Sequence, residues 1–164
     1  MAKIGSDQLL VPSILDRLID LEPGVTKELP KNSTQVLREM KESVRRDLEN
    51  LLNTRWRCGA MPPDLKELEV SLVSYGIPDF TGVRLSNARE REDFRRTVER
   101  TIKNFEPRFK TVTVKFLENA SETDRTLRFR VDAMLYAEPA PEPVMFDTAM
   151  EPTKGTFSVK GSAR

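Results

Sequence analysis

Glu106-Pro107-Arg108 is the segment in which residue types and spacing most clearly allow chemistry. It sets a carboxylate and a guanidinium two residues apart, and the proline between them restricts the backbone. Arg108 could there hold a carboxylate of another protein through two parallel hydrogen bonds, which lysine could not reproduce. Alternatively, Arg108 bonds the last carbonyls of a preceding helix, Glu106 faces solvent and Pro107 ends the helix. Composition alone favours this second interpretation.

Several other chemistries are excluded because the chain contains no histidine and a single cysteine, Cys58. No Ser-His-Asp or Cys-His nucleophilic site can form within this chain. A histidine-based zinc site is also excluded, and one thiolate cannot hold a metal alone. Carboxylate, lysine and tyrosine chemistry remain, and we expect no catalytic residue, no metal and no cofactor. One cysteine also excludes an internal disulfide and fits a reducing compartment.

Paired carboxylates could in principle hydrolyse a polysaccharide. That reaction needs two carboxyl groups about 5–10 Å apart across the sugar. The candidates by position are Glu90, Glu92, Asp93 and Glu106. With 26 acidic residues in the chain, chance explains such proximity, and one Trp and two Tyr offer few surfaces for stacking sugar rings. A polysaccharide hydrolase is therefore kept only as the alternative function.

Five arginines crowd one predicted helix: Arg89, Arg91, Arg95, Arg96 and Arg100. Phosphate binding by this row is conceivable. Acidic residues interleave with the arginines, however, and the whole chain has a net charge of only +1 from 27 basic and 26 acidic residues. We therefore expect a solvated face of mixed charge and no nucleic acid partner.

Two helices are predicted in the first third of the chain, after a loose arm at residues 1–12. A short one begins at Ser13, whose hydroxyl suits an N-cap. A long one runs from about Ser33 to Thr54, and Glu42 and Arg46 should form an ion pair on its exposed face. Its core positions step by three and four residues. They are Leu37, Met40, Val44, Leu48 and Leu51.

The middle of the chain gives weaker signals. Trp56 lies between two arginines and is either a core aromatic residue, which is favoured, or an anchor for a partner. Residues 65–75 fit a short helix or a strand, with the helix preferred. A clearer helix is capped by Ser86 or Asn87, the latter with Glu90 in a capping-box position, and ends at Pro107.

The last third has the alternation of antiparallel strands. Strands are predicted at about 111–118 and 127–135, joined by a polar hairpin loop at 119–124, and two shorter ones near 144–148 and 156–159. The proline-rich residues 137–143 should not pair within a central strand. The predicted fold is α+β, with N-terminal helices and a central helix packed on a small antiparallel or mixed sheet. We expect one domain at 13–160 and a frayed end at 161–164.

Four segments in this order resemble a known family. They are Val44–Arg55, Ser71–Phe80 with Tyr-Gly-Ile-Pro-Asp-Phe, Ile102–Arg108 with Phe-Glu-Pro-Arg, and Phe146–Thr148. The chain resembles the contractile-phage baseplate wedge proteins, called lysozyme-like for historical reasons, whose members include TssE of bacterial type VI secretion systems. The resemblance runs from about Ser13 to Val159.

The resemblance implies a structural, non-enzymatic protein of a contractile injection system. In the family the Glu-Pro-Arg motif contacts the helical core bundle of the wedge, which implies partner binding by Glu106, Pro107 and Arg108. The small sheet resembles the domain that joins sheath subunits by exchanged strands, which implies a role in sheath assembly. The roles of Trp56 and Cys58 are not implied.

The implied partners are the type VI baseplate wedge subunits TssF, TssG and TssK and the sheath subunits TssB and TssC. The implied location is cytoplasmic, at the inner face of the cell envelope. A cytoplasmic protein also fits the sequence, because no apolar run approaches the roughly 20 residues that a membrane span requires. The N-terminus has no signal-peptide core either.

Overall fold

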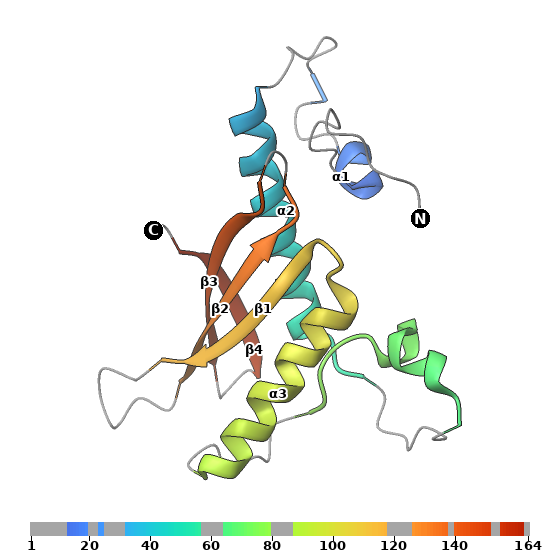
Figure 1. Cartoon of the computed structure of the whole chain (residues 1–164), viewed down its shortest axis with the longest axis vertical. Coiled ribbons are helices and arrows are strands. Elements are labelled where there is room, and N and C mark those ends of the chain that lie inside the picture. Colours follow the sequence, from blue (N-terminus) through green and yellow to red (C-terminus); the bar gives the residue numbers. More distant parts are fainter. Residues whose placement is uncertain are drawn as a thin grey trace.

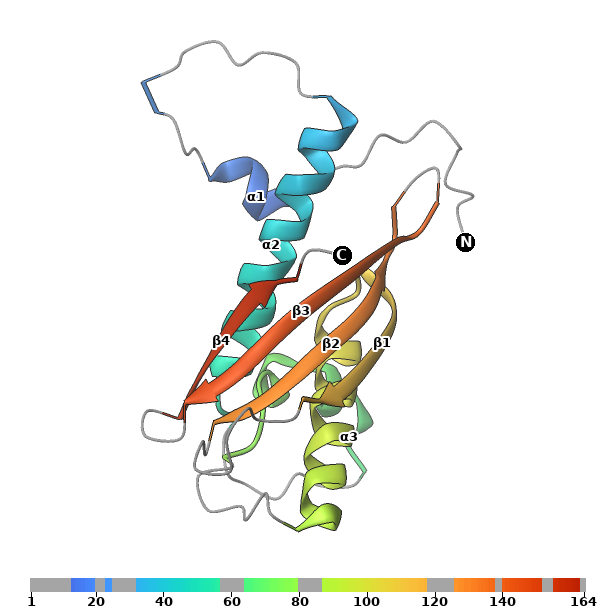
Figure 2. The same cartoon turned by 90° about the vertical axis from the view of Figure 1, so that its left-hand side faces the viewer.

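A four-stranded antiparallel sheet with two long helices on one face makes up most of the chain that the structure describes (Figures 1 and 2). The computed structural model describes residues 13–19, 23–24, 32–56, 64–79, 87–117, 126–137, 140–151 and 155–162. The strands lie in chain order. They are β1 (Phe109–Phe116), β2 (Leu127–Leu135), β3 (Glu142–Glu151) and β4 (Thr156–Gly161). The predicted α+β class, with helices packed on a sheet from the last third, is confirmed.

Helix α2 (Ser33–Asn53) packs along the β4 side of the sheet. Its start is fixed by a capping box in which the side chains and backbone amides of Asn32 and Gln35 bond each other at 2.8 and 3.0 Å. The predicted core stripe is buried in the C-terminal half of the helix, whereas its first two members stay partly exposed. The N-terminal half extends beyond the end of β4 (Figure 2), and there Lys41 binds Glu142 at the start of β3 at 2.9 Å.

Helix α3 (Ala88–Phe105) packs on β1. Asn87, one of the two predicted caps, is the N-cap, since its side chain accepts a hydrogen bond from the Arg89 amide at 2.9 Å. Its buried face comprises Phe94, Val98, Thr101 and Ile102. The Phe94 ring meets the Phe129 ring of β2 edge to face, with centroids 5.9 Å apart. The helix thus joins the same core as α2.

Strand β2 has the predicted alternation over its whole length. Phe129, Val131, Ala133 and Leu135 are buried under the helices, and the residues that alternate with them lie on the opposite face of the sheet. That opposite face carries cross-strand ion pairs, Lys115–Asp132 at 2.8 Å and Arg130–Asp147 at 2.6 Å. One face of the sheet therefore forms the core, and the other is polar.

The segment at 66–74 is helical, as preferred from the sequence, but it forms two 3-10 turns rather than an α-helix. They are η1 (Lys66–Val70) and η2 (Leu72–Ser74). After them Gly76 has a φ of 108°. A Cβ atom there would collide with the Thr54 carbonyl oxygen. Glycine therefore lets Ile77 pair with the end of α2, where the Ile77 amide bonds Thr54 and its carbonyl accepts from Trp56.

Strand β3 begins two residues earlier than the sequence predicts, so Pro143 pairs with Met134 inside a central strand. The expectation that residues 137–143 could not do so is wrong for Pro143. The reason is that successive residues of a strand direct their backbone hydrogen-bonding groups alternately toward its two neighbouring strands. Pro143 directs its backbone groups to the same side as Met145, and the Met145 carbonyl accepts a hydrogen bond from the Ser162 amide on the β4 side. Because β4 ends there, the proline nitrogen faces a local edge, where no donor is needed.

The outer edge of β4 is closed by side chains of α2. Asn53 donates to the Phe157 carbonyl and accepts from the Phe157 amide, both at 2.8 Å. Glu49 accepts from the Val159 amide at 3.3 Å, and Arg45 donates to the Val159 carbonyl at 3.1 Å. These three side chains, spaced four residues apart on one helix, bond β4 where a fifth strand would.

The outer edge of β1 carries one such contact. The Val114 amide donates to the Glu99 carboxylate of α3 at 2.8 Å. Val112 and Phe116 lie two residues before and after Val114 in the strand, so their backbone groups face the same outer side. The two edges of the sheet therefore differ.

The predicted arm at 1–12, hairpin loop at 119–124 and Cys58 lie outside the described residues.

Candidate functional site

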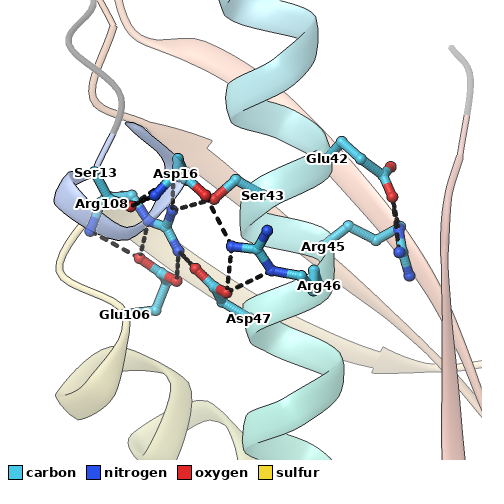
Figure 3. Close-up of polar contacts among 9 residues, drawn as sticks. All are labelled: Ser13, Asp16, Glu42, Ser43, Arg45, Arg46, Asp47, Glu106 and Arg108. Carbon is cyan, nitrogen blue, oxygen red and sulfur yellow. Dashed lines mark hydrogen bonds and ion pairs between the residues drawn. The ribbon is translucent and has the colours of Figure 1, made fainter. Parts of the chain in front are cut away.

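Glu106 and Arg108 lie at the turn between α3 and β1, as predicted, and their side chains bind each other (Figure 3). Arg108 Nε and Nη2 donate to the two carboxylate oxygens of Glu106, each at 2.6 Å. The Glu106 carboxylate also accepts from the Arg108 amide at 3.2 Å. Glu106 is 4% exposed. The interpretation in which Glu106 faces solvent is therefore wrong, while exposed Pro107 stops the helix as predicted.

Arg108 also reaches across to α2. Its Nη1 donates to Ser43 Oγ at 3.0 Å, and its Nη2 donates to Asp47 Oδ2 at 2.6 Å. Burial opposes the charge of Arg108, but the bonds to Glu106 and Asp47 outweigh it and raise the pKa of the guanidinium. Arg108 is therefore held as a permanent cation that joins the hinge to α2.

Helix α1 (Ile14–Leu18) supplies a third carboxylate, Asp16 (Figure 3). Asp16 accepts from Ser43 Oγ at 2.7 Å and from Arg46 Nη2 at 2.8 Å, and Arg108 Nη1 lies 4.0 Å away. Burial opposes its ionisation, but bonds from Ser13, Ser43 and Arg46 outweigh that effect and lower the pKa of Asp16 to about 2. The polar cluster thus contains Asp16, Ser43, Arg46, Asp47, Glu106 and Arg108.

Arg46 takes part in this cluster rather than in the predicted pair with Glu42, so that prediction is wrong. Arg46 contacts Asp16 and also Asp47, the latter at 3.2 Å. Glu42 instead binds Arg45 at 2.7 Å on the other side of α2 (Figure 3). A local i,i+4 rule could not foresee this, because Asp16 comes from a distant part of the chain.

The two motifs that carry the family resemblance meet beside the polar cluster. The Tyr75 ring contacts the Phe105 ring edge to face, with centroids 5.3 Å apart. Burial, and then the negative charges of Asp47 and Glu106, raise the pKa of Tyr75. The Tyr-Gly-Ile-Pro-Asp segment therefore braces the hinge that presents Arg108.

Sequence reasoning missed Asp16, Ser43, Arg46 and Asp47 as members of this cluster. One signal was available: Ser43 and Asp47 are polar, lie four residues apart on α2 and flank its core stripe. Ser43 is buried, which is unusual for serine unless its hydroxyl is bonded. Their partners on α1 and at the hinge could not be read from local spacing.

The arginines of α3 behave as the mixed-charge face that was predicted. Arg95 binds Glu92 and Glu99, and Arg96 also binds Glu92. Hydrogen bonds from these arginines lower the pKa of Glu92 to about 2. Arg91 lies over the Phe116 ring, 4.6 Å from its centroid.

Trp56, whose role was left open, is half-buried beside the paired end of α2.

Glu92, one of the carboxylates considered for polysaccharide hydrolysis, has its pKa lowered by the arginines that bond it. A glycosidase acid requires the opposite shift, since it must hold a proton near neutral pH. Within the described ranges, no helix is long and apolar enough to cross a membrane. The same ranges contain no group of three metal-binding side chains.

Comparison with known proteins gives one result that covers this site. A search of curated proteins found no match. The family model described as "Baseplate wedge protein gp25" matches residues 38–140. That match contains α2 from Arg38 onward, the hinge with Glu106 and Arg108, and strands β1 and β2. It includes the polar cluster except for Asp16. Since it spans more than half of the 164 residues, the chain belongs to the gp25 family of baseplate wedge proteins.

Proposed function

We propose that this protein is the type VI baseplate subunit that docks on the core bundle of the wedge through Glu106, Pro107 and Arg108. Its family is one of structural baseplate components. The observation that carries the proposal is the fixed orientation of Arg108, whose guanidinium is bonded on three nitrogens to the hinge and α2. A cation with one orientation loses little entropy when a partner binds it.

The proposed partners are TssF, TssG and TssK in the wedge and TssB and TssC in the sheath. The proposed location is the cytoplasmic face of the cell envelope, and the proposed role is non-enzymatic. The pairing of Glu92, a candidate carboxylate, with Arg95 and Arg96 supports that role, because it lowers the pKa of Glu92. Purified protein should leave a peptidoglycan suspension turbid. If the protein clears the suspension and one carboxylate substitution abolishes this activity, the hydrolase alternative is established.

Co-purification with a TssF–TssG complex tests the docking role. Arg108→Ala leaves Glu106 buried without its cation and should destabilise the fold by about 3 kcal/mol. Arg108→Lys and Glu106→Gln are therefore the better variants, because the first keeps the positive charge and the second keeps the size of the side chain, while both break the paired hydrogen bonds. We expect each to weaken wedge binding about tenfold or more while circular dichroism stays native.

Arg96→Lys is the matched control, since Arg96 is an exposed arginine of α3 whose acidic partner is Glu92. It should bind like the wild type. Unchanged wedge binding by folded Arg108→Lys and Glu106→Gln would exclude the docking role.

We further propose that the sheath contacts the β1 edge of the sheet. The support is the difference between the edges, because α2 side chains already bond β4 on its outer side. An added strand requires free backbone donors and acceptors. On β1 the outward amides include those of Val112, Val114 and Phe116, and the Glu99 carboxylate bonds the second.

Val112→Pro tests this edge. The substitution removes an outward amide without touching the ladder to β2, because the Val112 amide faces away from it. We expect loss of TssB–TssC recruitment and unchanged wedge binding. Val112→Ala is the control, since it removes similar packing and keeps the amide. Equal TssB–TssC recruitment by both variants would exclude a sheath contact at the β1 edge.

A further inference from the structure

Among the residues that the structure describes, helix α1 contacts the rest of the protein chiefly through one carboxylate. Its apolar side chains face solvent, with Ile14 78%, Leu15 57% and Leu18 75% exposed. The polar contacts of Asp16, by contrast, are close: Ser43 lies at 2.7 Å and Arg46 at 2.8 Å. A helix of five residues has little stability of its own. The position of α1 therefore depends on what Asp16 binds.

The groups around Asp16 belong to the rigid part of the fold. Ser43 and Arg46 lie on α2, and Arg108 lies at the start of β1. Asp47 bonds both arginines, at 3.2 and 2.6 Å, and Glu106 bonds Arg108. These contacts, drawn in Figure 3, join the two guanidiniums to α2 and to the hinge without any group from α1.

The charges of the polar cluster balance without Asp16 of α1. Two guanidiniums face two carboxylates, and Ser43 Oγ and Arg46 Nη2 each donate a further hydrogen bond to Asp16, while Arg108 Nη1, which donates to Ser43, lies 4.0 Å from Asp16. Two convergent donors and a nearby positive charge suit a planar anion of carboxylate size. A third carboxylate is therefore bound by donor geometry rather than by surplus positive charge.

We infer that Ser43, Arg46 and Arg108 form a receptor for one carboxylate, which Asp16 fills in the free chain and an Asp or Glu side chain of the wedge partner takes over on docking. This inference rests on the docking role proposed above and adds the chemistry of the partner. Asp16 is tethered to α2 and competes as an intramolecular ligand. The measured affinity for the partner is then the intrinsic affinity reduced by the fraction of chains with α1 released.

Asp16→Ala in the full chain tests the inference against the same TssF–TssG complex. Removal of the competitor should tighten binding, about three- to tenfold. Arg46→Ala removes a donor of the receptor and should weaken binding. Glu42→Ala is the matched control, because it also removes one negative charge but lies on the opposite side of α2, paired with Arg45. It should bind like the wild type.

Hydrogen exchange gives a readout that does not depend on affinity. Amides of residues 14–19 should exchange faster in the wild-type complex than in the free protein, because α1 is released. Weaker binding by Asp16→Ala, or slower exchange of α1 in the complex, would overturn the inference and make α1 part of the interface.

The failure of the docking role is distinguishable from the failure of this inference. If Arg108→Lys and Glu106→Gln bind normally, docking itself is wrong. If both weaken binding and Asp16→Ala does not tighten it, docking stands and the exchange of carboxylates is wrong.

Discussion

Arg108 uses three of its nitrogens to reach three different side chains, so its guanidinium has one orientation in the fold. Glu106 and Pro107 fix the backbone on one side, and Ser43 and Asp47 fix the head group on the other. The Glu-Pro-Arg motif is thus first a bond within the chain. The rigidity that it gives to the junction of α3 and β1 is the property that a docking site requires.

Gly76 gives a prediction at the same scale. Its φ is positive, and the Thr54 carbonyl lies so close to its Cα that no room is left for a Cβ atom. Gly76→Ala should therefore destabilise the protein by about 2 kcal/mol or more, measured as the free energy of unfolding in urea. Gly161→Ala, where nothing lies within 4 Å, should change it by less than about 0.5 kcal/mol. Equal effects would show that the Gly76 backbone is not constrained.

At the scale of elements, α1 and α2 are held in opposite ways. Helix α2 buries an apolar stripe and also bonds the β4 edge through Arg45, Glu49 and Asn53. Helix α1 exposes its apolar side chains and depends on Asp16. One element is therefore part of the core, and the other is bound like a ligand.

The α1 contact should depend on pH with a definite sign. The pKa of Asp16 is lowered in the folded protein from 3.8 to about 2, so the folded state favours the ionised form. The stabilisation is fully present above about pH 4 and is lost as the pH falls through about 2. A carbon NMR titration of the Asp16 carboxyl should show the low midpoint, and Arg46→Ala should move it back toward 3.8. A wild-type midpoint at the ordinary value would contradict the role of Asp16.

The closure of the β4 edge gives a second prediction at this scale. Asn53→Ala leaves the outward amide and carbonyl of Phe157 without their α2 partner. We expect a loss of about 1–2 kcal/mol in the free energy of unfolding. Asn50→Ala is the control, because Asn50 is an exposed asparagine of the same helix. A loss no greater than that of the control would show that water replaces the side chain.

For the whole molecule, the sequence predicts the order and type of elements well, because periodicity is a local property. The strand at 127–135 and the helix at 33–53 match the prediction within one residue. What the sequence does not predict are contacts between distant segments: Arg46 with Asp16, Arg108 with Asp47, and Asn53 with Phe157. Their spacing in sequence carries no signal. The family match supplies the baseplate role, which neither periodicity nor composition indicates.

The side chains of α2 that bond β4 have a consequence for assembly. An array built by strand exchange lengthens wherever a sheet offers an edge. In this subunit α2 occupies one edge, so under the β1 contact proposed here the array can lengthen from the other edge alone. Such a subunit can begin a row and cannot be inserted into the middle of one, which would give the growing structure a fixed origin and a single direction.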